Sequence, residues 1–157
     1  AVNIALSSEE GVQDFHVMRG NQFSSFLNPK ADEYDGLASV NAVAQTIPVR
    51  TSTFNSFYAE WKNKLGFRRP YLKLDTQGYD HVILRSGETA ARECTGVQAE
   101  IAFKRLYEGA LNFGETFSLM QDMGFALSTI FPNNAGHFPD CIEQDVIFHN
   151  CAIKPMK

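Results

Sequence analysis

The stretch from Tyr71 to Leu84 reads Tyr-Leu-Lys-Leu-Asp-Thr-Gln-Gly-Tyr-Asp-His-Val-Ile-Leu, and it decides the fold class. Its first five residues predict a short strand that ends in Asp75. Gly78 allows a tight turn after that strand, and segment 80–86 predicts a helix. Ligands of open α/β sheets bind beyond the carboxyl ends of the strands. The stretch therefore places Asp75 where such a sheet would bind a ligand.

Two further helices are predicted from side-chain spacing and capping residues. Segment 54–65 carries apolar side chains on one helical face. Ser52 or Thr53 can cap its beginning, and Gly66 suits its end. Asn112 can cap the other helix.

Apolar segments between these helices predict strands. The first two, 1–6 and 12–18, flank a turn and predict a hairpin. Segment 97–103 predicts a strand that contains Glu100. Segments 125–131 and 142–149 are joined by a loop, which suits an antiparallel pair. We therefore expect an α/β fold whose mostly parallel sheet ends in an antiparallel strand.

The composition is that of a globular chain and excludes several function classes. The chain has 157 residues, which suits one domain over 1–157. Its net charge of -4 argues against a broad nucleic-acid surface. It has no apolar run long enough to cross a membrane. Its three cysteines lack the spacing of a disulfide framework or a zinc site, which indicates reduced thiols and a cytoplasmic location.

One feature expected of a nucleotide-like cofactor site is absent from the sequence. No glycine-rich loop links a strand to a helix. The chain also begins inside an apolar, strand-like run without Met. We therefore expect an N-terminally truncated domain that lacks the first strands. Open strand edges tend to pair with another chain, which predicts a homodimer.

The acidic residues allow more than one interpretation. Asp75 could position a nucleophile, act as a base or bind a metal, or it could cap the following helix. Asp80 lies in the first turn of that helix, where it would interact with the helix dipole. Glu100, within an apolar strand, would need a partner if buried. A metal-dependent hydrolase using Asp75, Asp80 and Asp145 has irregular ligand spacing, so we expect no metal.

The stretch from Tyr71 to Leu84 resembles the signature of the FkbM methyltransferases, which runs Leu-Lys-Ile-Asp-Val-Gln-Gly-Tyr-Glu, two variable positions and Leu. Shorter resemblances follow in the order of the family. They are Asn3–Ser7, the pair Ser24 and Ser25, Val49–Asn55, Val97–Glu100, and the closing segments Gly124–Phe125 and Asp145–Phe148. The resemblance therefore covers nearly the whole chain.

The resemblance implies a Rossmann-like class I methyltransferase fold, S-adenosylmethionine as the methyl donor and O-methylation of a small molecule or sugar. It implies that Asp75 lies near the transferred methyl group and the acceptor hydroxyl, as the catalytic residue and a cofactor contact. The other residues that it implicates divide into two sets. Those expected to bind the substrate are Ser24, Ser25, Gln77, Gly78 and Glu100, and those expected to bind the cofactor are Ala5, Leu6 and Ser7.

The chain also departs from the family pattern. Asp80 replaces the Glu of the signature, and Asn55 takes the place of an Asp. The first two strands, with the glycine loop and the acid that holds the ribose, have no counterpart. These departures keep an alternative open, in which the chain is a non-catalytic binding or assembly domain derived from a methyltransferase.

Overall fold

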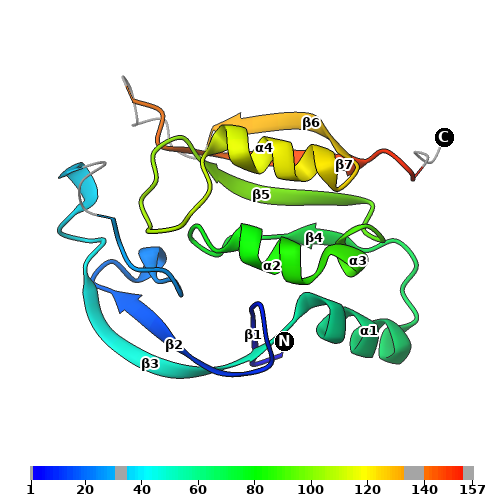
Figure 1. Ribbon diagram of the computed structural model, residues 1–157, viewed down its shortest axis with the longest axis horizontal. Coiled ribbons are helices and arrows are strands. Elements are labelled where there is room, and N and C mark those ends of the chain that lie inside the picture. The colour runs from blue at the N-terminus through cyan, green and yellow to red at the C-terminus, as the bar shows by residue number, and fades with distance from the viewer. Residues whose placement is uncertain (1, 31–34, 133–139, 154–157) are drawn as a thin grey trace.

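The computed structural model describes residues 2–30, 35–132 and 140–153, which form two β-sheets with helices beside them (Figure 1). The three-stranded sheet has the order β1-β3-β2 and the four-stranded sheet has the order β4-β5-β7-β6. The strands are β1 (Ala5–Leu6), β2 (Gly11–Met18), β3 (Val43–Ser52), β4 (Tyr71–Lys73), β5 (Gly96–Ala102), β6 (Phe125–Pro132) and β7 (Glu143–Asn150).

The helices cover one face of the four-stranded sheet and pack along its lower edge in the view of Figure 1. They are α1 (Phe54–Leu65), α2 (Asp80–Ser86), α3 (Glu88–Ala91) and α4 (Phe113–Asp122), with the short 3-10 turns η1 (Asn21–Phe23) and η2 (Asp35–Leu37). Alternate residues of β5 point to the helices, so Val97, Ala99 and Ile101 are buried. Glu100 points to the opposite face. None of the described helices is long and apolar enough to cross a membrane.

Both sheets are mixed. β1 runs parallel to β3 and β4 runs parallel to β5, whereas the β2–β3, β5–β7 and β6–β7 pairs are antiparallel. The α/β class and the antiparallel final strand are therefore confirmed. The mostly parallel, Rossmann-like sheet is not confirmed, because β4–β5 is the only parallel pair among the described strands of the four-stranded sheet.

The predicted hairpin of the first two strands is wrong. β1 and β2 do not pair with each other, because β3 lies between them. Thr51 of β3 is opposite Ala5 on one side and opposite Gly11 on the other. The ten-residue β3 thus offers both of its edges to the N-terminal strands, and local sequence spacing gave no sign of this distant partner.

The predicted helix boundaries agree with the capping contacts. The Thr53 side chain accepts a hydrogen bond from the Ser56 amide at 3.1 Å, and Gly66 ends α1 with a φ of 64°. Asn112 and Glu115 form a reciprocal capping box at the start of α4. These local contacts fix where α1 and α4 begin.

Two clusters of buried apolar side chains hold the elements together. The main cluster joins α1, α2, α3 and α4 to the four-stranded sheet through residues such as Leu84, Val97 and Phe148. The smaller cluster joins the region of β2 to the loop after β5. Its buried members are Met18, Phe23, Leu106, Tyr107, Ala110 and Ile142. The second cluster therefore brings the two sheets together next to the carboxyl end of β4.

We predict that Gly87→Ala destabilises the fold by about 1–3 kcal/mol, the usual cost of overpacking. A Cβ at Gly87 would lie 2.4 Å from the Phe54 Cβ, so α1 would have to move away from the α2–α3 junction. Urea unfolding followed by circular dichroism measures the loss.

Gly114→Ala is the matched control, because a Cβ there meets its nearest atom at an ordinary 3.6 Å. Alanine also favours the helical conformation of α4, so this variant should be neutral or slightly stabilising. Equal unfolding midpoints for the Gly87 variant and wild type would contradict the packing of α1 described above.

Candidate functional site

The turn that follows β4 has an unusual backbone. Leu74 still pairs with β5, its amide donating to the Gln98 carbonyl at 2.8 Å. The chain then reverses through Gln77 and Gly78, whose φ angles are 52° and 83°. Gln77 is the only non-glycine residue with a positive φ in the described part of the chain. Such a conformation costs free energy and persists only where the surroundings enforce it.

Three neighbours hold Gln77 in place. The Ser25 hydroxyl donates to the Gln77 carbonyl at 2.8 Å. The side-chain amide of Gln77 lies between two groups, with Nε2 2.9 Å from Glu100 Oε2 and Oε1 3.0 Å from the Tyr107 hydroxyl. The turn is thus fixed by residues from three distant parts of the chain, 52, 23 and 30 positions away.

Gly78 allows two segments to approach closely. A Cβ at this position would lie 3.0 Å from Tyr107 Cδ2 and 3.1 Å from the Ala110 Cβ. The space next to Gly78 is therefore occupied by the protein itself. Gly78 is needed for the turn and for this packing; its predicted contact with a substrate stays a prediction.

Asp75 lies outside the turn with about half of its side chain exposed. Its Oδ2 accepts a hydrogen bond from Lys73 Nζ at 2.8 Å, and its Oδ1 is 3.5 Å from Gln77 Nε2. The alternative in which Asp75 caps the following helix is wrong, because Tyr79 occupies the N-cap of α2 and no side chain bonds there. Asp75 therefore remains open to a ligand at the strand end.

Asp80 is turned in the opposite direction and is buried. Its Oδ1 accepts hydrogen bonds from the amide and the hydroxyl of Thr76, which closes the turn. Its Oδ2 is buried without a hydrogen bond of ordinary geometry within the described residues. Burial raises the pKa of Asp80 to about 6, although the bonds from Thr76 oppose the change.

Glu100 lies beside the turn on β5, opposite Asp145 of β7. Burial raises its pKa to about 8, and the negative charges of Glu143, Asp75, Asp80 and Asp145 add to this effect. We refer to these five carboxyl groups as the acidic cluster. Within the described residues, no group of three or more His, Cys, Asp or Glu side chains is arranged to hold a metal ion.

The segment predicted to contact the cofactor reaches the same turn from the other sheet. The Tyr79 and Ser7 hydroxyls are 2.8 Å apart, and Ser7 Oγ donates to Gln13 Oε1 at 2.7 Å. The Ser86 hydroxyl donates to the Ser7 carbonyl at 2.9 Å. Ser7 is fully buried, and Ala5 and Leu6 before it are half-buried in β1. The N-terminal segment is thus tied to both ends of α2.

The predicted site residues fall into two groups in space. One group contributes to the structure around the turn and consists of Ser25, Gln77, Glu100 and Ser7. Ser24 instead accepts a hydrogen bond from the Met18 amide at 3.2 Å and so stabilises its own loop. None of these contacts tests a role in binding, so the assigned roles stay predictions.

Sequence reasoning missed Tyr107. This side chain is 3% exposed, and its hydroxyl lies 2.8 Å from the Phe23 carbonyl as well as 3.0 Å from Gln77 Oε1. Tyr107 follows β5 in an irregular loop, where no periodicity or motif marks it. A contact between residues 30 positions apart has no signature in a single sequence.

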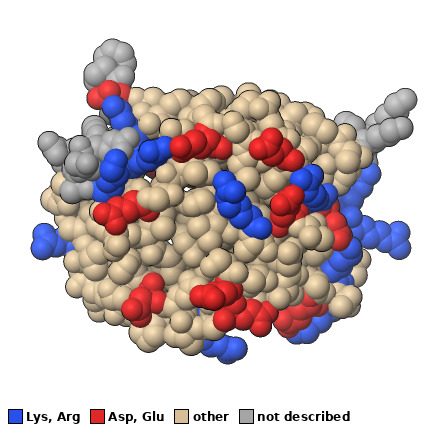
Figure 2. Space-filling model, viewed as in Figure 1, with Lys and Arg blue, Asp and Glu red and all other residues tan. Residues whose placement is uncertain are grey.

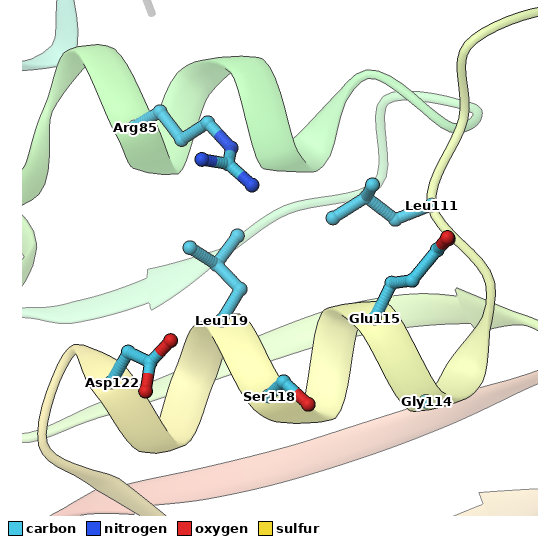
Figure 3. Close-up of a pocket in the computed structure, with 7 residues that line it drawn as sticks. All are labelled: Arg85, Leu111, Gly114, Glu115, Ser118, Leu119 and Asp122. Carbon is cyan, nitrogen blue, oxygen red and sulfur yellow. The ribbon is translucent and has the colours of Figure 1, made fainter.

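Two open cavities lie beside α2, α4 and the loop after β5. One, of about 460 Å³, separates α2 from α4, with Arg85 facing Leu119 across it (Figure 3). The other is lined by Lys30, Arg105 and Tyr107 among others. Neither is lined by Asp75, Gln77 or Glu100. Asp75, Gln77 and Glu100 therefore lie outside the linings of these two cavities.

The charged side chains are mixed on the face shown in Figure 2. Lys and Arg side chains lie on both sides of this face, interspersed with Asp and Glu side chains. Within the described helix, Lys62 and Lys64 are already ion-paired with Glu93 and Glu60. The face shown in Figure 2 therefore carries no continuous basic surface.

The raised pKa of Asp80 predicts a loss of stability with rising pH. Between pH 4 and 6 the folded protein retains a proton that the unfolded chain has released, so the free energy of unfolding falls. Asp80→Asn keeps an acceptor for Thr76 and removes this titration. The free energy of unfolding of Asp80→Asn should therefore fall less steeply with pH than that of wild type. Over this range the two slopes should differ by up to about 1.4 kcal/mol per pH unit.

Urea unfolding at intervals from pH 4 to pH 8 checks the prediction. Glu100→Gln serves for comparison, because Glu100 has the higher pKa and its removal should flatten the curve up to about pH 8. Parallel curves for Asp80→Asn and wild type would show that Asp80 is ionised across the range.

Comparison with protein families matches residues 1–127 to the Methyltransferase FkbM domain. The match runs from the N-terminal segment to the beginning of β6 and so includes every residue of the turn. Comparisons with curated proteins and with solved structures find no match. The chain belongs to the FkbM methyltransferase domain family, as the stretch from Tyr71 to Leu84 predicted.

Proposed function

We propose that the protein catalyses S-adenosylmethionine-dependent methyl transfer to a hydroxyl group of a small molecule or sugar. Membership of the FkbM family supports methyl transfer in general. The observation that carries the proposal is the convergence at one turn of Asp75, Gln77 and Glu100 with the Ser7 segment of the other sheet. Polar groups from several elements that meet at a strand end are typical of an α/β binding site.

The residues at the turn fit the charge of the methyl donor. The donor carries a positive sulfonium centre, and the acidic cluster supplies negative charge beside the carboxyl end of β4. Bound S-adenosylmethionine supplies an electrophilic methyl group. The glycine loop that would hold the rest of such a cofactor is not in this sequence. The residues at the turn therefore match the sulfonium end of the cofactor and not the remainder of it.

Asp75 is the residue that we propose as the catalytic group. It is half exposed and follows β4 directly. Its Oδ1 lies at 3.5 Å from Gln77 Nε2, too far for a strong hydrogen bond, which leaves lone pairs for an acceptor hydroxyl. Asp75 would orient that hydroxyl and take the proton that it loses as the new O–C bond forms and the S–C bond of the methyl donor breaks. Lys73 Nζ donates a hydrogen bond to Asp75 Oδ2 at 2.8 Å, which holds the carboxyl group in place.

A second candidate function is a binding or assembly domain that kept the family's sheet without the donor site. The missing glycine loop favours it. Such a domain would bind a partner but would not bind S-adenosylmethionine. Cofactor binding therefore separates the two candidates.

We predict that S-adenosylmethionine and S-adenosylhomocysteine bind the protein in isothermal titration calorimetry. Ser7→Ala should weaken binding about tenfold or less, because the hydrogen bonds that hold the N-terminal segment against Tyr79 and Gln13 are lost. Ser118→Ala, in the α2–α4 cavity, is the control and should bind like wild type.

Absence of binding, in this chain and in the complete gene product if that is longer, would contradict the methyltransferase proposal and favour the second candidate. The cofactor site would instead lie in the α2–α4 cavity if Ser118→Ala weakens binding and Ser7→Ala does not.

We also propose a homodimer and a cytoplasmic location. Within the described residues, β4 pairs only with β5 and β6 pairs only with β7, so each leaves one edge open. β6 has no charged residue and exposes Leu127, Ile130 and Phe131. A neutral, apolar edge can pair with a second copy of itself without charge repulsion.

Light scattering after size exclusion should give twice the monomer mass for wild type. Phe131→Lys should shift the protein to the monomer, since a charge on an edge strand opposes pairing. Phe131 is half exposed, so the substitution should leave the core of the folded protein unchanged. A monomeric wild type would contradict the dimer.

A further inference from the structure

We infer that the end of α1 and the loop that follows it dock on the surface of an anionic lipid bilayer. Six residues make up this surface, which we call the α1 patch: Trp61, Lys62, Lys64, Leu65, Arg68 and Arg69. The α1 patch combines apolar side chains with basic ones on one part of the surface. Protein surfaces that bind at a membrane interface have this composition.

The apolar face of α1 leaves the core along the length of the helix. Phe54 and Tyr58 lie on this face, and each is only 6% exposed. Trp61, one turn further along, is half-buried, and its ring centroid lies 6.0 Å from that of Phe57. Leu65 is 67% exposed, the largest exposed fraction of any large hydrophobic side chain in the described residues. The last turn of α1 therefore carries its apolar face past the core and into solvent.

The two lysines of the α1 patch lie beside these apolar groups. Lys64 Nζ is 4.8 Å from the centre of the Trp61 ring. Lys62 and Lys64 form ion pairs with Glu93 and Glu60 at the surface of the protein. Exposed ion pairs contribute little free energy, so both ammonium groups can exchange these partners for lipid phosphates. A lysine stem can also lie along an apolar surface while its charge stays among the headgroups.

The two arginines give the α1 patch its excess of positive charge. Arg68 and Arg69 are exposed, and neither forms an ion pair or a side-chain hydrogen bond within the described residues. The loop that carries them is fixed on both sides. Phe67 packs against the main apolar cluster, and the Pro70 carbonyl accepts hydrogen bonds from the amide and the hydroxyl of Thr95 at 2.8 and 2.9 Å. The two charges are therefore held next to the end of α1.

The composition of the α1 patch favours a bilayer over a soluble polyanion. A polyanion would contact the arginines and would leave Leu65 in water. A bilayer surface accommodates the leucine beside the acyl chains, the tryptophan at the level of the headgroups and the cations at anionic phosphates. Docking of this kind does not require the chain to cross the bilayer.

The α1 patch lies at the opposite end of β4 from the strand-end turn. The loop 66–70 leads into Tyr71, where β4 begins, whereas Asp75 follows the end of that strand. The chain from α1 to β4 runs along the right-hand side of the molecule in Figure 1. A bilayer bound to the α1 patch would therefore leave the turn uncovered.

Tryptophan fluorescence tests the inference directly, because Trp61 is the single tryptophan of the chain. Vesicles of phosphatidylcholine and phosphatidylserine should shift its emission to shorter wavelength. Brominated phosphatidylcholine in the same vesicles should quench it. Vesicles of phosphatidylcholine alone should bind more weakly, and raised salt should weaken binding to the anionic vesicles.

Two variants of the α1 patch separate its apolar and basic contributions. Leu65→Ser should weaken partitioning onto the anionic vesicles about tenfold, because the burial of its side chain is lost. Arg68→Gln combined with Arg69→Gln should weaken it about fivefold for each charge removed. The matched control is Val12→Ser combined with Arg50→Gln, since Val12 is 65% exposed and lies opposite Arg50 in the β2–β3 pair. This control should bind like wild type.

Four results would overturn the inference. They are no partitioning onto the anionic vesicles, partitioning in which brominated lipid does not quench Trp61, equal partitioning of wild type and both patch variants, and a response to the soluble polyanion heparin as strong as that to vesicles. Each can be measured without a methyl donor or acceptor. The methyl-transfer proposal and the membrane proposal can therefore fail independently of each other.

Discussion

The left-handed conformation of Gln77 and Gly78 determines how the strand-end site is built. Two successive positive φ angles reverse the chain within a few residues of β4. This reversal leaves Asp75 exposed on one side and buries Asp80 on the other, where Thr76 binds it. Without it, α2 could not begin at Asp80 and still pack against the sheet. The conformation is stabilised by Ser25, Glu100 and Tyr107, which belong to other segments.

The turn also connects the two sheets. Ser25 belongs to the loop after β2, and Ser7 follows β1, so both contacts come from the three-stranded sheet. Tyr107 links the turn to the smaller apolar cluster between the sheets. The conformation of the turn and the packing of the sheets are therefore coupled. A ligand that binds at the turn would contact segments that this network holds in place. Its binding would therefore depend on both the conformation of the turn and the packing of the sheets.

The sequence predicted those features that depend on neighbours along the chain. The caps of α1 and α4, the start of α2 and the strand before Asp75 depend on local contacts and were confirmed. The pairing of β1 and β2 was wrong because both strands bind β3, more than 20 residues away. The network around Gln77 could not be predicted either. Its partners are joined only in three dimensions, and Tyr107 has no motif that marks it.

The central claim is that the turn after β4, with the Ser7 segment beside it, forms the binding site. Amide NMR during titration with S-adenosylhomocysteine tests it most directly. The account predicts that the largest shifts fall on residues 5–7 and 75–79 and on Glu100. Shifts confined to the α2–α4 cavity, at Arg85 and Ser118, would contradict it.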